Sequence, residues 1–276
     1  MHFRFFDIPF EITCDSARIA AQVEVLFDLF RDAGGDEPLL TYEIVSGHEG
    51  FDILREGRIL EPLPGVTDPL VTLEEYVMRD VIAERPGILF IHAAVLAKHG
   101  MGLVLPGQSG AGKSTLAYAL ASRGWIYYSD EVAPIELRGM EVLPFPRSIK
   151  LRPGAERIFP HLASHFRDGD GYRHYCGVRK LGVRIGESAA PVRLLVFPSR
   201  CAGLAPRLAA MSRSVAVTML AQCCFSFSRD QGKALQQIAA LVNGVQCYSL
   251  QTGDLGESCA IIERLAEEAA AQPAYG

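Results

Sequence analysis

Four residues near the middle of the chain have the spacing of a phosphate-binding loop. Gly107, Gly112, Lys113 and Ser114 fit the pattern G-x-x-x-x-G-K-[ST]. A glycine-rich loop turns successive N–H groups toward one anion, the lysine adds a charge for the β- and γ-phosphates, and the serine hydroxyl suits Mg²⁺. We therefore predict ATP and Mg²⁺ as cofactors. The residues expected to hold the nucleotide are Gly107, Gln108, Ser109, Gly110, Ala111, Gly112, Lys113, Ser114 and Thr115.

An acidic pair follows the loop at a distance suited to a second half of the site. Asp130 and Glu131 come directly after residues 125–129, WIYYS, which are typical of a strand. Phosphoryl transfer needs a carboxylate for the metal and a base for the hydroxyl acceptor. We expect one of the two carboxylates to take the proton while the other faces the metal. The alternative is a solvated pair at a strand end.

One histidine upstream of the loop is a third candidate. His92 lies in the apolar run FIHAAV. On residue types alone, a histidine among apolar neighbours is more often a core residue with satisfied hydrogen bonds than a catalyst. Both interpretations stay open on that evidence.

The segments around these residues are predicted to form the strands and helix of a phosphate-binding core. Residues 88–91 and 93–97 are typical of strands, and residues 98–100, Lys-His-Gly, of a tight hairpin turn. Residues 101–105 then form the strand that leads into the loop. A helix over residues 114–122 follows and stops at Gly124.

Residues 1–70 are predicted to be a β-rich region with one helix, and residues 71–276 to be the kinase-like domain. The first region comprises an edge strand at residues 2–13, a helix from Asp15 or Ser16 to about residue 31, and strands at 39–45 and 51–60. Residues 61–69, rich in proline, are expected to be a linker. A helix over residues 73–84, capped by Thr72, opens the second region.

Later segments complete an α/β pattern with added antiparallel hairpins. Residues 132–137 and 140–143 are predicted to form a hairpin, and residues 165–186, rich in Gly, Asp, His and Arg, a mobile substrate loop. Weak helical character at 153–166 is followed by strands at 192–198 and 246–250. Helices are expected from Ser212 to about 224, over 232–242 and from Asp254 to about 270.

Composition narrows the class of protein. A net charge of −5 argues against a general nucleic-acid binder, and the longest apolar stretches are too short to span a bilayer. Seven cysteines without a C-x-x-C pair indicate reduced thiols rather than a disulfide or zinc framework. The first residues lack the apolar run of a signal peptide. We therefore expect a cytoplasmic protein with no membrane or nucleic-acid partner.

The sequence resembles a known kinase family in four places. The runs His92-Ala93-Ala94-Val95, Gly107 to Ser114, Arg123-Gly124-Trp125 and Asp130-Glu131 are similar to the catalytic domain of the HPr serine kinase/phosphorylase family. They resemble more narrowly its bacterial HPr kinase-related group, which lacks the N-terminal regulatory domain. The resemblance implies a P-loop kinase core of the PEP-carboxykinase-like type, and it makes a homo-oligomer plausible.

The resemblance also implies roles for individual residues. Asp130 would be the general base toward a serine hydroxyl, with His92 as its partner, while Ser114 and Glu131 would hold the metal. Ser212-Arg213-Ser214 is similar to a Gly-Arg-Asn segment of the family, which implies that Arg213 stabilises the transferring charge. The alternative for Arg213 is a plain capped start of a helix.

The chain departs from the family at three points. Glu131 replaces the second Asp of the pair, and Ala-Ala follows the histidine in place of Gly-Val. The E-x-R-G signature is not at its expected place; residues 136–139 have those letters but are interpreted as a hairpin turn. Arg147 and Lys150 stand near the expected place instead. They would bind phosphates or an acidic partner, or form a solvated basic face, and the reverse, phosphorolytic activity is left open.

Together these features favour an ATP-dependent kinase that transfers the γ-phosphate to a serine-type hydroxyl of a small protein or peptide, with Lys113 neutralising the developing charge. Two alternatives remain. One is an ATP-dependent binding module with little phosphotransfer, in which nucleotide orders the 165–186 segment. The other is a small-molecule kinase that acts on free serine or a sugar.

Overall fold

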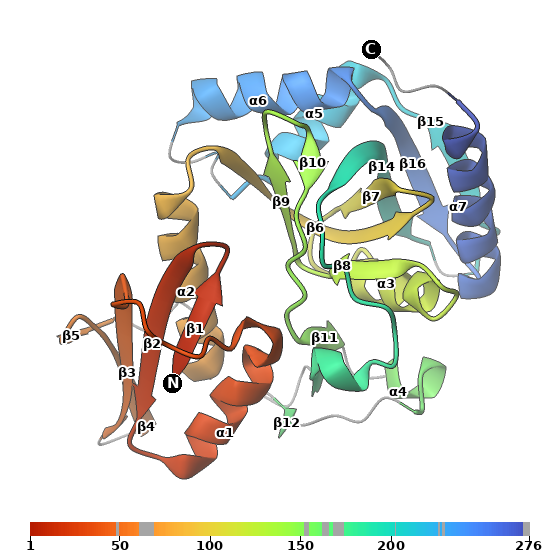
Figure 1. Cartoon of the computed structure of the whole chain (residues 1–276). Coiled ribbons are helices and arrows are strands. Elements are labelled where there is room, and N and C mark those ends of the chain that lie inside the picture. Colours follow the sequence, from red (N-terminus) through yellow and green to blue (C-terminus); the bar gives the residue numbers. More distant parts are fainter. Residues whose placement is uncertain are drawn as a thin grey trace. The chain divides into compact units, whose positions relative to one another are not determined.

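The computed structural model divides the chain into two compact units (Figure 1). It describes residues 1–47, 50–60, 69–151, 155–161, 166–167, 174–201, 203–225, 227 and 230–272. The first unit comprises Met1–Arg85 and Arg147–Leu181, and the second comprises Pro86–Pro146 and Gly182–Gly276. The first unit is thus made of two separate segments of the chain, whereas the sequence-based division at residue 70 predicts a continuous one.

The first unit contains a five-stranded sheet in the order β1-β2-β3-β4-β5. Its strands are β1 (His2–Phe5), β2 (Ile8–Cys14), β3 (Leu40–Gly47), β4 (Gly50–Arg55) and β5 (Arg58–Ile59). The prediction of one strand over residues 2–13 was wrong. The chain reverses at Phe6, which has a φ of +57°, and β1 and β2 pair antiparallel. Apolar residues alternate on both sides of this turn, so the sequence pattern runs through it.

Helices and a ring cluster complete the core of this sheet. Helix α1 (Ala17–Leu26) joins the parallel strands β2 and β3, and it is followed by a 3-10 turn, η1 (Asp28–Phe30). Five aromatic rings pack together in stacked, tilted and edge-to-face pairs: Phe3, Phe5, Phe10, Phe27 and Phe30. The one-sided alternation of β1 and β2 therefore marks the buried face of the sheet.

Helix α2 (Pro69–Glu84) starts earlier than the sequence predicts. Thr72 lies inside the helix, so its predicted role as the cap was wrong. Proline is well tolerated in the first turn because its missing N–H has no partner there in any case. The predicted linker at 61–69 lies outside the described residues, except for Pro69 itself.

The returning segment of the first unit contains a small three-stranded sheet in the order β11-β13-β12. Its elements are β11 (Ile149–Leu151), α4 (Ala155–Ile158), β12 (Phe166–Arg167), β13 (His174–Cys176) and the 3-10 turn η2 (Val178–Lys180). Among the described residues, the predicted helix over 153–166 is confined to α4. The predicted substrate loop over 165–186 includes β12, β13 and η2, and its residues 165 and 168–173 lie outside the described part of the chain.

The second unit is a mixed α/β sheet that carries the phosphate-loop motif. The order β10-β9-β6-β7-β14-β16-β15 contains parallel β7, β14 and β16, whereas β6 runs antiparallel to β7. Its strands are β6 (Ile88–Lys98), β7 (Met101–Pro106), β8 (Ile126–Ser129), β9 (Val132–Glu136), β10 (Glu141–Val142), β14 (Ala190–Arg200), β15 (Arg207–Ala210) and β16 (Gln246–Thr252). Because β10 pairs with both β9 and β14, five strands close into a ring. The predicted hairpin between β9 and β10 is confirmed.

Helices cover both faces of this sheet. Helices α5 (Arg213–Ala221) and α6 (Gln231–Asn243) share one apolar cluster with β6 and β14, while α3 (Lys113–Ala121) and α7 (Leu255–Ala270) pack together on the other side. The predicted helices at 114–122, 232–242 and 254–270 are confirmed to within a residue or two. Helix α5 ends at Ala221 rather than near residue 224, because the residues that follow pair with β6.

The turn between β6 and β7 fixes the register on which the site depends. His99 and Gly100 have φ values of +53° and +73°, the geometry of a two-residue hairpin turn. The predicted tight turn is confirmed. With this register Ala93 pairs with Pro106, so His92 lies level with the residue that begins the loop.

Candidate functional site

The phosphate-loop residues lie between the end of β7 and the start of α3. Gly110 and Gly112 have φ values of +93° and +92°, which side chains other than glycine rarely adopt. A Cβ on Gly107 would lie 3.2 Å from the Cβ of Ala111, so the loop is also tight. The cap of α3 is Gly112, which has no side chain to bond the first helical N–H groups. This curled loop at a helix N-terminus is suited to an anion.

The ammonium of Lys113 lies across the loop. Its Nζ donates to the carbonyl oxygens of Gly107 at 2.7 Å and Gln108 at 3.2 Å, and lies 3.0 Å from Nε2 of His92. The side chain is only 6% exposed. Lys113 therefore occupies the position from which it would reach a phosphate bound in the loop.

His92 connects the loop to the acidic pair. Its Nδ1 lies 3.4 Å from Oε1 of Glu131, while its Nε2 faces Lys113. An ammonium only donates, so Nε2 must accept and Nδ1 carries the proton toward the carboxylate. The sequence left His92 between a core residue and a catalyst, and the geometry places it between two charged groups of the site.

The two acidic residues have different surroundings although they are adjacent in the chain. Asp130 is fully buried, and the hydroxyl of Tyr127 donates to its Oδ1 at 3.2 Å. The side chain of Glu131 is 27% exposed. A proton on a substrate hydroxyl can therefore reach Glu131, or His92 beside it, more directly than Asp130.

Strand β6 lies between the loop strand β7 and strand β8, which carries the acidic pair. These two strands are therefore not direct neighbours. Val95 pairs with Ser129, the N–H of Ala93 donates to the carbonyl of Glu131 at 3.1 Å, and the N–H of Gly107 to that of His92 at 3.4 Å. Strand β6 thus holds the loop and the carboxylates at the same edge of the sheet.

A short segment after α5 also supports this arrangement, and its residue types do not predict that role. The carbonyl of Cys223 accepts from the N–H of His92 at 2.6 Å, and the N–H of Phe225 donates to Phe90 at 3.0 Å. The amide of Gln108 donates to the carbonyl of Gln222 at 3.1 Å. Burial raises the pKa of the Cys223 thiol, which keeps it protonated beside the loop. These are mainly backbone contacts, so no residue type marks them in the sequence.

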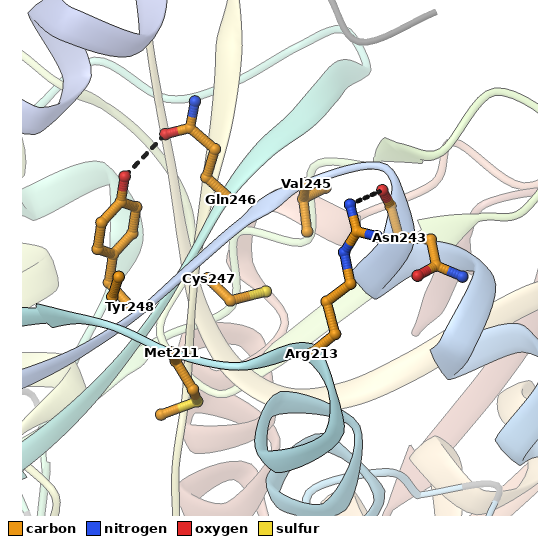
Figure 2. A pocket seen from close by; sticks show the side chains of 8 residues that line it. Met211, Arg213, Asn243, Val245, Gln246, Cys247 and Tyr248 are labelled. Atoms are coloured by element: carbon orange, nitrogen blue, oxygen red, sulfur yellow. Dashed lines mark hydrogen bonds between the residues drawn. The ribbon is translucent and has the colours of Figure 1, made fainter.

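The structure does not bring Arg213 into the group around Lys113. Arg213 begins the nine-residue helix α5, and the opposite end of this helix approaches the loop, about 13 Å away at 1.5 Å per residue. Its guanidinium donates to the carbonyl of Asn243 at 3.5 Å beside a cavity of about 240 Å³ (Figure 2). This position does not support the charge-stabilising role that the resemblance implied, whereas the capped helix start is observed, with Ser212 as the cap.

Arg147 has a structural role in the first unit. It is 5% exposed, and its Nη1 lies 2.8 Å from Oε1 of Glu74 on α2. The hydroxyl of Ser148 beside it donates to the carbonyl of Val25 at 2.6 Å. The prediction of a solvated basic face is therefore wrong for Arg147, and its buried pair with Glu74 does not support binding of phosphates or an acidic partner. The side chain of Lys150 lies outside the described residues.

The donor set of the second unit fits a hard cation held together with a nucleotide. Ser114 lies in the first turn of α3. Asp130 and Glu131 follow the last residue of β8, at the edge of the sheet from which the loop also emerges. Within the described ranges, no group of three or more His, Cys, Asp and Glu side chains forms a metal site. Mg²⁺ at nucleotide sites takes only one or two protein oxygens besides phosphates and water, so hydroxyl and carboxylate groups of this kind suffice.

The described helices include none that is both long and apolar enough to cross a membrane. Comparison with protein-family models gave no matching family, and a search of curated proteins gave no match. The geometry around Lys113 is therefore the basis on which a function can be assigned.

Proposed function

We propose that this protein is an ATP- and Mg²⁺-dependent kinase that phosphorylates a serine-type hydroxyl of a small protein or peptide. One observation carries the proposal: the phosphate-loop lysine, His92 and Glu131 form a continuous chain of polar contacts of 3.0 and 3.4 Å. A phosphate-binding loop alone would serve a motor or a switch equally well. A proton acceptor next to the loop lysine is what transfer to a hydroxyl needs.

The proposed core is of the PEP-carboxykinase-like type, as the resemblance to the HPr kinase family implies. Support comes from the mixed sheet, in which β7 enters the loop with antiparallel β6 on one side and parallel β14 on the other. Support also comes from the antiparallel hairpins β6–β7 and β9–β10 beside it.

In the proposed mechanism the loop and the N-terminus of α3 hold the phosphates of ATP. Lys113 exchanges the carbonyls of Gly107 and Gln108 for phosphate oxygens, and this exchange also frees Nε2 of His92. Ser114 and one carboxylate would hold Mg²⁺, which when bound would neutralise charge on the phosphates. The incoming hydroxyl gives its proton to the acceptor beside the loop.

Either carboxylate can be assigned the role of base. The family resemblance assigns Asp130 as base and Glu131 as metal ligand. The geometry favours neither carboxylate as the direct base, because Asp130 is fully buried under Tyr127 and Glu131 pairs with the His92 ring. We propose that Nε2 of His92, with Nδ1–H held by Glu131, receives the proton, and that Asp130 faces the metal.

A nucleotide-dependent binding module is the second candidate. The specific observation in its favour is the burial of Asp130, which restricts access to one of the two carboxylates. Such a module would bind ATP through the same loop and lysine, so nucleotide binding alone does not separate it from a kinase.

The test is to measure ATP–Mg²⁺ binding by calorimetry, and transfer of label from γ-³²P-ATP to proteins of a cell extract. Lys113→Ala should lose nucleotide binding at least tenfold and all transfer, whereas Lys180→Ala, at an exposed lysine of the first unit, should change neither. Tight ATP binding without a labelled product would favour the module. Unchanged ATP affinity in Lys113→Ala would contradict both candidates.

A further inference from the structure

Helix α5 presents an exposed apolar face. Val215 is 48% exposed and Met219 is 37% exposed, and their spacing of four residues places them on the same side of the helix. The other exposed residues of the helix after Arg213 are Ser214 and Thr218, which are uncharged. A helix face in contact with solvent normally carries charged residues, so this face is unusual for a solvated surface.

Two more exposed apolar residues lie on the neighbouring segments. Phe225, 39% exposed, lies just after α5, and Leu235, 45% exposed, lies on α6. The two helices run antiparallel, since Arg213 at the start of α5 donates to Asn243 at the end of α6. Leu235 is therefore level with the C-terminal end of α5. We call Val215, Met219, Phe225 and Leu235 the α5 surface.

One end of the α5 surface lies at the phosphate loop. The ring of Phe225 meets the ring of His92 edge-on, with centroids 5.9 Å apart. Gln222, the residue after α5, accepts from the Gln108 side chain in the loop. A molecule seated on the α5 surface would therefore extend directly to the residues that we propose to carry out transfer.

The charged residues of helices α5 and α6 are both cations, Arg213 and Lys233, in a chain whose net charge is −5. The nearest carboxylate in the sequence is that of Asp230, which caps α6. Arg213 lies at the far end of α5 beside the cavity lined by Asn243 and Gln246 (Figure 2).

We infer that the α5 surface docks an acidic amphipathic segment of the acceptor protein, an inference that rests on the proposed kinase function. Apolar side chains of the segment would pack on Met219 and Phe225, and its carboxylates would face Arg213 and Lys233. A segment along α5 spans the length of that helix, about 13 Å. The phosphorylated hydroxyl would therefore lie about nine helical residues from the carboxylate that pairs with Arg213.

Fluorescence anisotropy with a labelled 16-residue peptide tests the inference. The peptide carries Leu at helical i, i+3, i+4 and i+7 spacing with Glu at the other positions, and a control peptide carries Lys in place of Glu. The Glu peptide should bind the full chain, and Met219→Glu and Arg213→Glu should each weaken binding at least tenfold. Leu204→Glu, at an apolar residue 56% exposed outside α5 and α6, should leave binding unchanged.

Val215→Glu gives a second variant of the surface, and ATP affinity shows that each variant is folded. Equal binding of the Lys peptide, or no saturable binding of the Glu peptide by a chain that binds ATP, would overturn the inference. So would sedimentation of the wild-type chain as a dimer that Met219→Glu dissociates, because a second copy would then cover the surface. Failure of the wild-type chain to bind ATP would instead contradict the proposed function.

Discussion

Asp130 and Glu131 both carry carboxylates, but solvent reaches Glu131 and not Asp130, and variants of the two residues test the consequence. Glu131→Gln removes the carboxylate beside Nδ1 of His92, so transfer should fall about 100-fold or more while ATP affinity changes little. Asp130→Asn should keep ATP binding, lower transfer and raise the Mg²⁺ concentration needed for half-maximal transfer, because a carboxylate that faces the metal is lost. Calorimetry and rates over a Mg²⁺ titration check both variants. Unchanged transfer in Glu131→Gln would show that Glu131 does not hold His92 as the proton acceptor, and would favour Asp130 as the base.

The buried pair of Arg147 and Glu74 should stabilise the first unit. Glu74→Gln leaves a buried guanidinium without the carboxylate of residue 74, which should cost about 3 kcal/mol in the free energy of unfolding. Glu24→Gln serves as the matched control, because Glu24 pairs with Arg31 in an exposed position and should cost less than about 1 kcal/mol. Urea unfolding of the two variants measures the difference. Equal losses would show that burial of the pair has no energetic consequence.

Two buried thiols make stability depend on pH in the alkaline range. Burial raises the pKa of Cys247 and Cys259 to about 11, from about 9 in the unfolded chain. The folded state then holds protons that the unfolded state loses, so the contribution of each thiol is complete below pH 9 and is lost as the pH rises toward 11. At pH 10 each should cost about 1 kcal/mol relative to pH 8.

The variants Cys247→Ala and Cys259→Ala isolate this effect. Each should flatten the decline of unfolding free energy between pH 8 and pH 10, even where the substitution lowers stability at all pH values. Cys201→Ala is the control, at a half-buried cysteine of a loop. The same slope in wild type and in both variants would contradict the assignment.

At the scale of elements, glycines in two turns allow the effect of backbone strain on stability to be distinguished from its effect on ATP binding. Gly112 in the phosphate loop and Gly100 in the β6–β7 turn have φ values of +92° and +73°, and no atom lies within 4 Å of a Cβ added to either. Gly112→Ala and Gly100→Ala should therefore each cost about 1 kcal/mol through strain alone. Thermal unfolding and calorimetry should show a loss of ATP affinity in Gly112→Ala only. A similar loss in Gly100→Ala would mean that the loop depends on the distant turn.

Elements with local signals were predictable and elements with tertiary causes were not. The loop, the turn at His99 and Gly100 and the cap at Asp254 follow from residue types within a few positions, and the structure has them. The reversal at Phe6 was missed because period-two alternation is the same in one long strand and in a hairpin. The position of β6 between β7 and β8 depends on strand pairing, which the sequence pattern does not specify.

The residues of the candidate site were likewise predictable only where residue type and spacing identify them. Lys113, His92 and Glu131 were candidates from residue type and spacing, and the structure brings them together. Arg213 was a candidate from a three-residue similarity, which holds no information about which end of α5 meets the loop. The brace of Gln222 and Cys223 acts through main-chain atoms and so leaves no signature in the sequence.

At the scale of the whole molecule, the segment 147–181 is an insertion in the second unit. The backbone N–H of Phe145 donates to the carbonyl of Tyr128, and the backbone N–H of Tyr127 donates to the carbonyl of Arg184. Both ends of the insertion are therefore held on β8. A fragment of residues 86–276 in which a short Gly-Ser linker replaces 147–181 should therefore fold and bind ATP with nearly the affinity of the full chain. Circular dichroism, thermal unfolding and calorimetry check this.

The matched fragment keeps 147–181 but lacks residues 1–85. It should unfold at lower temperature or self-associate, because Arg147 and Ser148 lose their partners Glu74 and Val25. A linker fragment that fails to fold would show that the second unit requires the first. Equal behaviour of the two fragments would show that the insertion is independent of residues 1–85.

The pair of Glu74 and Arg147 also sets an order of events during synthesis. Arg147 leaves the ribosome about 70 residues after Glu74, which at about 5–20 residues per second is a delay of roughly 4–15 s. During that time the nascent chain has already delivered β6 to β10, while α2 still lacks its buried counter-charge. The earliest residues to be translated therefore complete their unit after most of the phosphate-loop sheet has emerged, and the two units mature in an interleaved sequence rather than one after the other.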